Sequence, residues 1–255
     1  RRQGSSPSRM RILLTNDDGI ESVGLRALSE RLGAGHEIYV IAPATQRSAA
    51  GHGISVHSPL SYGVLDPGGC RMRIAVDGTP ADCVKLAVLY FMKDRLPDLV
   101  IAGINEGSNV GSDVIYSGTV SAALEGAYMG VRSIAVSNSD RAFLDGYAFA
   151  ADFIADNLNV FSSLHMPDYT ALNINYPGEK HRGSAIVPVG RNRYSDSFRE
   201  VGANVLQIGG QPLDEETDGE TDVSQVRRGF VTISPVTLDM NDYALLSRLK
   251  GEFST

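Results

Sequence analysis

The sequence predicts an α/β fold, a three-layer Rossmann-like and mostly parallel sheet with a C-terminal hairpin or arm. Two observations predict it. Short aliphatic runs alternate with segments of helical periodicity through the first half of the chain, a pattern typical of parallel sheets with helices on both faces. Beyond about residue 165 the alternation gives way to separate strand patterns. We therefore expect a Rossmann-like core at 10–165 and, at 166–255, C-terminal strands and an arm.

The first strand and helix follow from hydrophobic spacing. The aliphatic run at 11–14 predicts a buried strand. After it, Leu25, Leu28 and Leu32 recur on one helical face, and Gly33 is expected to end that helix. A second aliphatic run then predicts the next strand, at 38–42.

The next elements are recognised by their boundaries. The segment 79–82, Thr-Pro-Ala-Asp, predicts a helix start with a Thr cap and Pro at the first helical position, and this helix is expected to run through Leu89 and Tyr90. Residues 99–102 predict another buried strand, followed by a glycine-rich loop at 103–118.

The pattern then continues into the last third. We expect a helix over 120–129 capped by Thr119 and ended by Gly130, and a strand at 134–136. The C-terminal elements come last: strands at 172–175 and 185–189, an extended hairpin or arm between 191 and 210, and a solvated acidic loop at 214–222.

Composition places the chain among soluble globular enzymes. Of its 255 residues 42% are hydrophobic and 21% charged, and the net charge of −7 argues against general nucleic-acid binding. It has no apolar stretch long enough to span a bilayer. Residues 1–9 are polar, so we interpret them as a disordered tail or a cloning remnant. Cys70 and Cys83 lack metal-site spacing and are expected to be reduced thiols in a cytoplasmic protein.

Four polar segments follow predicted strands or lead into a predicted helix. They are Asp17–Asp18, the loop 42–51, the loop 103–111 and the turn 116–119. Ligands of open α/β sheets bind outside the carboxyl ends of the strands, so we expect these segments to converge.

The chemistry of these segments suits a metal ion beside a phosphate. Asp17 and Asp18 supply anionic oxygens, while Ser48 and Asn105 supply neutral ones, and hard cations such as Mg²⁺ and Mn²⁺ prefer oxygen ligands. The turn 117–119 brings backbone N–H groups to a helix N-terminus, a favourable place for a phosphate. Each piece alone also fits a cap, a turn or a surface serine; their joint occurrence favours a site.

Six stretches of the chain resemble the SurE family, the stationary-phase survival-protein nucleotidases. Two of them are the opening RILLTNDDGI and the segment YSGTVSAALEG. The similar stretches are residues 11–20, 42–49, 78–84, 103–109, 116–126 and, more weakly, 229–235.

The resemblance implies a metal-dependent phosphatase of nucleoside 5′- and 3′-monophosphates that binds one Mg²⁺ or Mn²⁺ per subunit. It implies a homodimer or homotetramer with exchanged C-terminal segments. The implied metal ligands are Asp17, Asp18, Ser48 and Asn105, and the implied phosphate-binding residues are Asn109, Ser117, Gly118 and Thr119.

The mechanism expected is phosphomonoester hydrolysis, in which Asp17 or Asp18 acts as general base or nucleophile. A response-regulator receiver is disfavoured because Ala102 and Gly103 stand where its phosphoacceptor aspartate would be. An Asp-x-Asp phosphatase is disfavoured because the acids are adjacent and followed by Gly19. A non-catalytic nucleotide sensor on the same fold stays open.

A few further residues have weaker signals. His52 and His57 flank the loop 42–51, and one of them is a candidate acid for the leaving group, although polar loop or core histidines are the more common explanation. Four arginines near the arm are candidates to meet a base or a second phosphate, or to form a solvated face or a subunit contact, and replacing Arg191 is expected to raise KM more than it lowers turnover. They are Arg182, Arg191, Arg193 and Arg199.

Overall fold

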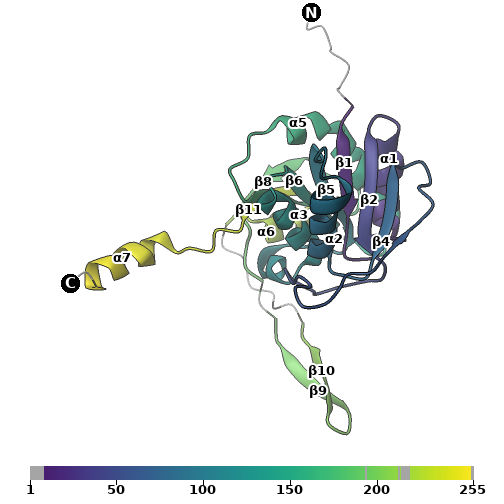
Figure 1. Cartoon of the computed structure of the whole chain (residues 1–255). Coiled ribbons are helices and arrows are strands. Elements are labelled where there is room, and N and C mark those ends of the chain that lie inside the picture. The colour runs from purple at the N-terminus through teal and green to yellow at the C-terminus, as the bar shows by residue number, and fades with distance from the viewer. Residues whose placement is uncertain (1–8, 193, 212, 214–218, 254–255) are drawn as a thin grey trace, which may run out of the picture.

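A nine-stranded, mostly parallel sheet forms the centre of the computed structural model, which describes residues 9–192, 194–211, 213 and 219–253 (Figure 1). This confirms the predicted fold class; the expected tail lies outside the described residues except for Arg9. In spatial order the strands are β3 (Tyr62–Val64), β4 (Met72–Val76), β2 (Glu37–Pro43), β1 (Arg11–Thr15), β5 (Leu99–Glu106), β6 (Ser133–Asn138), β7 (Thr170–Tyr176), β11 (Val231–Thr237) and β8 (Ser184–Ile186).

The strand pairing places β1 at the centre of a parallel block. From β4 through β2, β1, β5 and β6 to β7 every neighbouring pair is parallel, whereas β3 joins β4 and β11 joins β7 in antiparallel fashion. Strand β2 lies on one side of β1 and β5 lies on the other, so the order in which the chain adds parallel strands to the sheet reverses direction at β1. The carboxyl end of β1 is therefore the topological switch point, where open α/β sheets bind ligands.

Helices cover both faces of this sheet (Figure 1). On one face α1 packs with α4, and on the other α2 packs with α3. The helices are α1 (Val23–Gly33), α2 (Pro80–Leu86), α3 (Gly118–Tyr128), α4 (Asp145–Asp156), α5 (Leu158–Ser163), α6 (Asp222–Arg227) and α7 (Tyr243–Phe253), with a π-helical turn at Ala87–Phe91 and a 3-10 turn at Gly111–Ile115.

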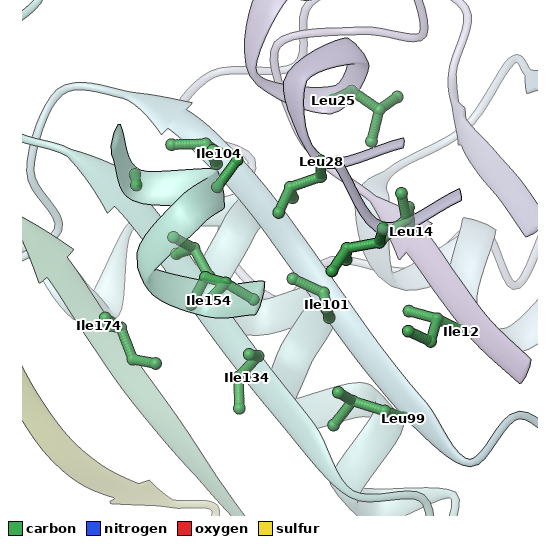
Figure 2. Close-up of a cluster of buried hydrophobic side chains, with 14 of the residues drawn as sticks. Ile12, Leu14, Leu25, Leu28, Leu99, Ile101, Ile104, Ile134, Ile154 and Ile174 are labelled. Carbon is green, nitrogen blue, oxygen red and sulfur yellow. The ribbon is translucent and has the colours of Figure 1, made fainter. Parts of the chain in front are cut away.

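The buried strand β1 shows how the layers are built. Its side chains alternate between faces, so Ile12 and Leu14 join the cluster under α1 while Leu13 joins the cluster under α2 and α3. Figure 2 shows Leu14 near Leu28 of α1, and Ile12 farther along β1 in the same cluster. Each fully buried side chain of this size contributes about 1.5–3 kcal/mol.

Helix α2 begins as predicted, and its α-helical part ends at Leu86. Thr79 and Asp82 form a reciprocal capping box, with Pro80 in the first turn. The α-helical hydrogen bonding stops at Leu86, and the wider π-helical turn that follows leaves Leu89 and Tyr90 largely exposed. The predicted helix therefore does run through these two residues, but its second part, Ala87–Phe91, is π-helical rather than α-helical.

Two boundaries around the glycine-rich segment also differ from prediction. Strand β5 continues to Glu106, so residues 103–106, predicted as loop, lie in the sheet. A register irregularity between Ala102 and Asn105 lets the strand bend there without leaving its neighbour β6. The cap of α3 is Ser117, whose side chain accepts from the Val120 N–H, and not Thr119 as predicted.

The C-terminal third contains the predicted hairpin, formed by β9 (Ser197–Gly202) and β10 (Val205–Gly209). Residues 214–218 of the predicted acidic loop lie outside the described residues. At the end of that segment Asp222 is fully buried rather than solvated, because its carboxylate accepts from the N–H groups of Gly111 and Gly190. Both cysteines are free, as expected.

Candidate active site at the switch point of the sheet

The loops that follow β1, β2 and β5 meet the N-terminus of α3 around an open cavity of about 420 Å³. The site was predicted from the order of these segments along the chain, and the fold brings them together. The predicted residues that line the cavity are Asp17, Asp18, Ser48, Asn105, Asn109 and Ser117.

Asp17 is the most buried of the predicted residues that line the cavity, with 5% of its surface exposed. Its Oδ1 accepts a 2.6 Å hydrogen bond from Thr119 Oγ1, and its carboxylate also accepts from the backbone N–H groups of Gly118 and Thr119. Burial raises the pKa of Asp17, although these hydrogen bonds oppose the rise. In this structure the Asp17 carboxyl group therefore accepts hydrogen bonds at the N-terminus of α3.

Asp18 lies beside it with fewer partners. Its Oδ2 accepts a 3.0 Å hydrogen bond from the Glu106 N–H. Burial, and then the neighbouring Asp17 carboxylate, raise the pKa of Asp18 to about 6. Two adjacent carboxylates that repel each other in a partly dry cavity are an electrostatic arrangement that a divalent cation relieves.

Two neutral oxygens complete the predicted ligand set. Ser48 Oγ accepts a 2.9 Å hydrogen bond from Gln46 Nε2. Asn105 Nδ2 donates to the Gly107 carbonyl at 2.7 Å, which leaves Asn105 Oδ1 as an acceptor for a ligand.

This donor set suits Mg²⁺ or Mn²⁺ because all of its atoms are oxygens. Across the described part of the chain no group of three or more His, Cys, Asp or Glu side chains is placed to hold a metal. A metal at this site would therefore use two carboxylates and neutral oxygens, and would keep coordination positions for water and substrate.

Asn109 is held from three sides by a buried polar network. Its N–H donates to Asn175 Oδ1 at 2.8 Å, its Nδ2 donates to Ser137 Oγ at 2.9 Å, and its carbonyl accepts from Asn173 Nδ2 at 2.7 Å. Because one amide hydrogen is already bonded, one remains for a ligand. Strand residues of β6 and β7 thus fix a side chain that belongs to the loop after β5.

Gly118 allows α3 to approach the carboxylates. A Cβ atom at this position would lie 2.9 Å from Asp17 Cβ, closer than side-chain atoms approach one another. Gly118 and Thr119 do not line the cavity themselves. They contribute through the contacts with Asp17 described above.

One cationic residue of the cavity was missed from the sequence. Arg141, in the loop after β6, lines the cavity and is the only Lys or Arg among its lining residues. Arg141 could have been identified from the sequence by its position, because it follows the end of β6, the parallel strand next to β5 in the sheet. Arg182, Arg191 and Arg199 are not in the lining, and Arg193 lies outside the described residues.

The two histidines also lie outside the cavity lining. His52 Nε2 instead makes a 2.8 Å contact with Glu125 Oε2, so the structure gives no support to a leaving-group acid at this position. His57 is exposed.

Fold and site together define a Rossmann-like α/β protein with an oxygen-donor site and a helix N-terminus at its switch point. Comparison with known proteins gives the family. The family model "Survival protein SurE" matches residues 12–196. The chain belongs to the SurE family.

Individual relatives are similar over nearly the whole chain. The 5'-nucleotidase SurE of Pelotomaculum thermopropionicum is 44% identical over 252 residues, covering 96% of each chain. That of Moorella thermoacetica is 41% identical over 254 residues, also covering 96% of each. The crystal structure of the SurE protein from Aquifex aeolicus matches with a TM-score of 0.83 at 32% identity, covering 95% of this chain and 99% of that one.

Proposed function

We propose that this chain is a metal-dependent phosphatase that hydrolyses nucleoside 5′- and 3′-monophosphates to nucleoside and phosphate. One observation carries the proposal: the Asp17–Asp18 pair and the N-terminus of α3 meet in one cavity, joined by the Thr119–Asp17 hydrogen bond. The relatives named 5'-nucleotidase support the 5′ activity. The 3′ activity and the metal requirement are our extension.

We assign one divalent cation per subunit, Mg²⁺ or Mn²⁺, to the oxygens of the four predicted ligands. When bound, the cation neutralises phosphoryl charge and lowers the pKa of a water molecule. The ligands are Asp17, Asp18, Ser48 and Asn105.

Phosphate binding and proton transfer would be carried out by side chains and backbone N–H groups of the chain itself. Asn109, Ser117 and the N–H groups of Gly118 and Thr119 bind the substrate phosphate. Asp17 holds the metal and the end of α3, because its Oδ1 is already engaged by Thr119. The Asp18 carboxylate has fewer hydrogen-bond partners, so we assign Asp18 as the general base that accepts a proton from the attacking water.

This arrangement links metal and phosphate binding. In the structure Asp17 accepts from the same N–H groups that are assigned to the phosphate. Two anions at one helix N-terminus repel each other unless a cation lies between them. The substrate phosphate is therefore expected to bind weakly until the metal is bound.

The test is phosphate release from 5′- and 3′-nucleoside monophosphates, with and without Mn²⁺ or Mg²⁺. We expect activity only with metal, and a loss of at least about 100-fold in kcat for Asp18→Asn and for Asn105→Ala, because each removes a ligand oxygen from a sparse site. Near-native turnover of either variant would refute the metal assignment. A nucleotide that raises Tm but is never hydrolysed would favour the sensor alternative.

We further propose a homodimer or homotetramer in the cytoplasm. The support is exposed apolar surface on the hairpin and on α7, which monomeric proteins rarely present in such amounts. Within the described ranges, no helix is long and apolar enough to cross a membrane. The exposed side chains are Phe198, Val201, Val205, Leu206 and Ile208 on the hairpin and Leu245, Leu246, Leu249 and Phe253 on α7.

A further inference from the structure

A buried carboxylate lies two turns along the helix whose N-terminus forms part of the site. The Glu125 side chain of α3 is 6% exposed and makes two ion-pair contacts. Lys85 Nζ, from α2, is 2.6 Å from Glu125 Oε1, and His52 Nε2 is 2.8 Å from Glu125 Oε2. Glu125 thus joins two helices and the loop after β2.

The environment keeps Glu125 charged. Burial alone would raise its pKa, but the hydrogen bonds and charges of His52 and Lys85 outweigh burial and lower the pKa below its ordinary value. A buried carboxylate that loses a partner is destabilised strongly. Glu125 therefore holds both partners in place.

The partner that matters for the site is His52, because it belongs to the loop at residues 44–59, here called the Ser48 loop. The Arg47 N–H donates to the Asp17 carbonyl at 2.7 Å, just before Ser48. The Gly51 N–H donates to the Tyr116 carbonyl at 3.2 Å, just after it. Ser48, which lines the cavity, lies between these two backbone anchors.

The far half of the Ser48 loop is fixed elsewhere, at the N-terminus of α2. Ser55 donates to Asp82 through both its N–H and its hydroxyl, each at 2.8 Å, and Thr79 Oγ1 donates to the Gly53 carbonyl at 2.7 Å. His52 is therefore the side-chain anchor on the Ser48 side of Gly53, directly next to the weaker of the two backbone anchors.

We propose that Glu125 is a positioning residue, which acts through His52 to latch the Ser48 loop onto α3 and so hold the Ser48 hydroxyl at the metal position. The inference rests on the proposed function for its metal. Groups that orient metal ligands from outside the coordination sphere commonly change metal affinity by 10- to 100-fold. Here the Glu125 carboxylate would orient the loop that carries Ser48. Glu125 itself belongs to α3, the helix whose N-terminus is assigned to the phosphate.

The experiment compares three variants of the full chain without substrate. His52→Ala removes the latch, His52→Gln keeps an N–H donor at a similar distance, and Lys85→Met removes the other partner of Glu125 without touching the loop. Two quantities are measured: amide hydrogen exchange of the peptide 46–53, and the Kd for Mn²⁺ from the electron paramagnetic resonance signal of the free ion.

For His52→Ala we expect faster exchange of the peptide and a Kd for Mn²⁺ raised about tenfold. His52→Gln should restore both to within about threefold of the wild type. Lys85→Met should lower Tm but leave the exchange rates and the Kd within about twofold, since its effect is confined to the helix pair.

The outcomes separate this inference from the proposed function. Wild-type affinity and exchange in His52→Ala, or equal changes in Lys85→Met, would show that Glu125 only stabilises the fold and would overturn the inference. Wild-type protein that binds no Mn²⁺ would instead refute the proposed function, and the positioning role with it. Faster exchange in His52→Ala with unchanged Mn²⁺ affinity would leave a latch without a role at the metal, which also overturns the proposal.

Discussion

The switch-point cavity and the hairpin with α7 have opposite chemistry. In the cavity, polar side chains such as Asp17 and Asn109 are more than nine-tenths buried and hydrogen-bonded. On the hairpin, Phe198 and Ile208 are 68% and 65% exposed, and α7 buries none of its residues. Figure 1 shows both the hairpin and α7 reaching away from the sheet.

The contrast indicates what each region is built to contact. Burying polar groups costs free energy unless they are paired, so a cluster of them at strand ends is typical of a site for a polar ligand. Exposing apolar surface to water also costs free energy, and contact with a protein partner removes that cost. The cavity therefore fits a small charged ligand, and the exposed apolar surface of the hairpin and α7 is the basis of the proposed homo-oligomer.

The largest expected effect separates the two regions. Ile208→Glu places a charge where Ile208 faces Phe198 across the hairpin. This variant should be monomeric at micromolar concentration, where we expect the wild type to form the proposed oligomer, as measured by light scattering. Gln207→Glu, one residue away on the other face of the strand, is the matched control and should leave assembly unchanged.

The activity of Ile208→Glu tests whether the hairpin and the cavity function independently of each other. Before the hairpin begins, Tyr194 Oη donates to Asp113 Oδ2 at 2.6 Å, and Asp113 lines the cavity, whereas Ile208 does not. We therefore expect kcat/KM of Ile208→Glu to stay within about threefold of the wild type. An assembled Ile208→Glu protein would contradict the assigned interface, and a monomer without activity would show that the two regions are not separable.

A smaller effect is expected inside the cavity from Arg141. Removing its charge in Arg141→Gln should raise KM for a nucleoside monophosphate about tenfold, or about 1.4 kcal/mol, with kcat changed less than threefold, because it would contact the phosphate before and during reaction. Arg191→Gln is the control: Arg191 does not line the cavity, so KM should be unchanged. If KM rose in Arg191→Gln and not in Arg141→Gln, the result would instead support the expectation from sequence that Arg191 contacts the substrate.

The location of the site could be predicted from sequence because it depends on local signals. Strand ends at Thr15 and Pro43 are marked by carboxylates and proline, and parallel topology brings such ends to one edge. The cap at Thr79 is equally local, with its partner three residues away.

What the sequence could not show depends on distant partners. Asp222 lies in an acidic, turn-rich segment, yet is buried because it bonds to Gly111, 111 residues earlier. His52 has the pattern of a loop histidine, and only the fold reveals Glu125, 73 residues away. The end of α2 at Leu86 was missed for a different reason, since no residue there breaks a helix.

The smallest expected effect concerns stability and the cost of keeping two carboxylates together. The folded-state pKa of Asp18 is about 6, above its unfolded value near 3.8, so the folded protein binds more protons between these values. Stability from this group is present at low pH and is lost as pH rises through about 6. Two pKa units correspond to about 3 kcal/mol at most, which solvent access to Asp18 reduces.

Without metal, Asp18→Asn should therefore have a Tm about 3–5 °C above the wild type at pH 7.5, and the difference should shrink by pH 5, as measured by calorimetry. Added Mn²⁺ should raise Tm of the wild type and not that of Asp18→Asn, because only the carboxylate pair gains from the cation. A wild type that is more stable than Asp18→Asn without metal would mean that the pair is stabilised by the protein itself, and the electrostatic argument for a cation at this cavity would fail.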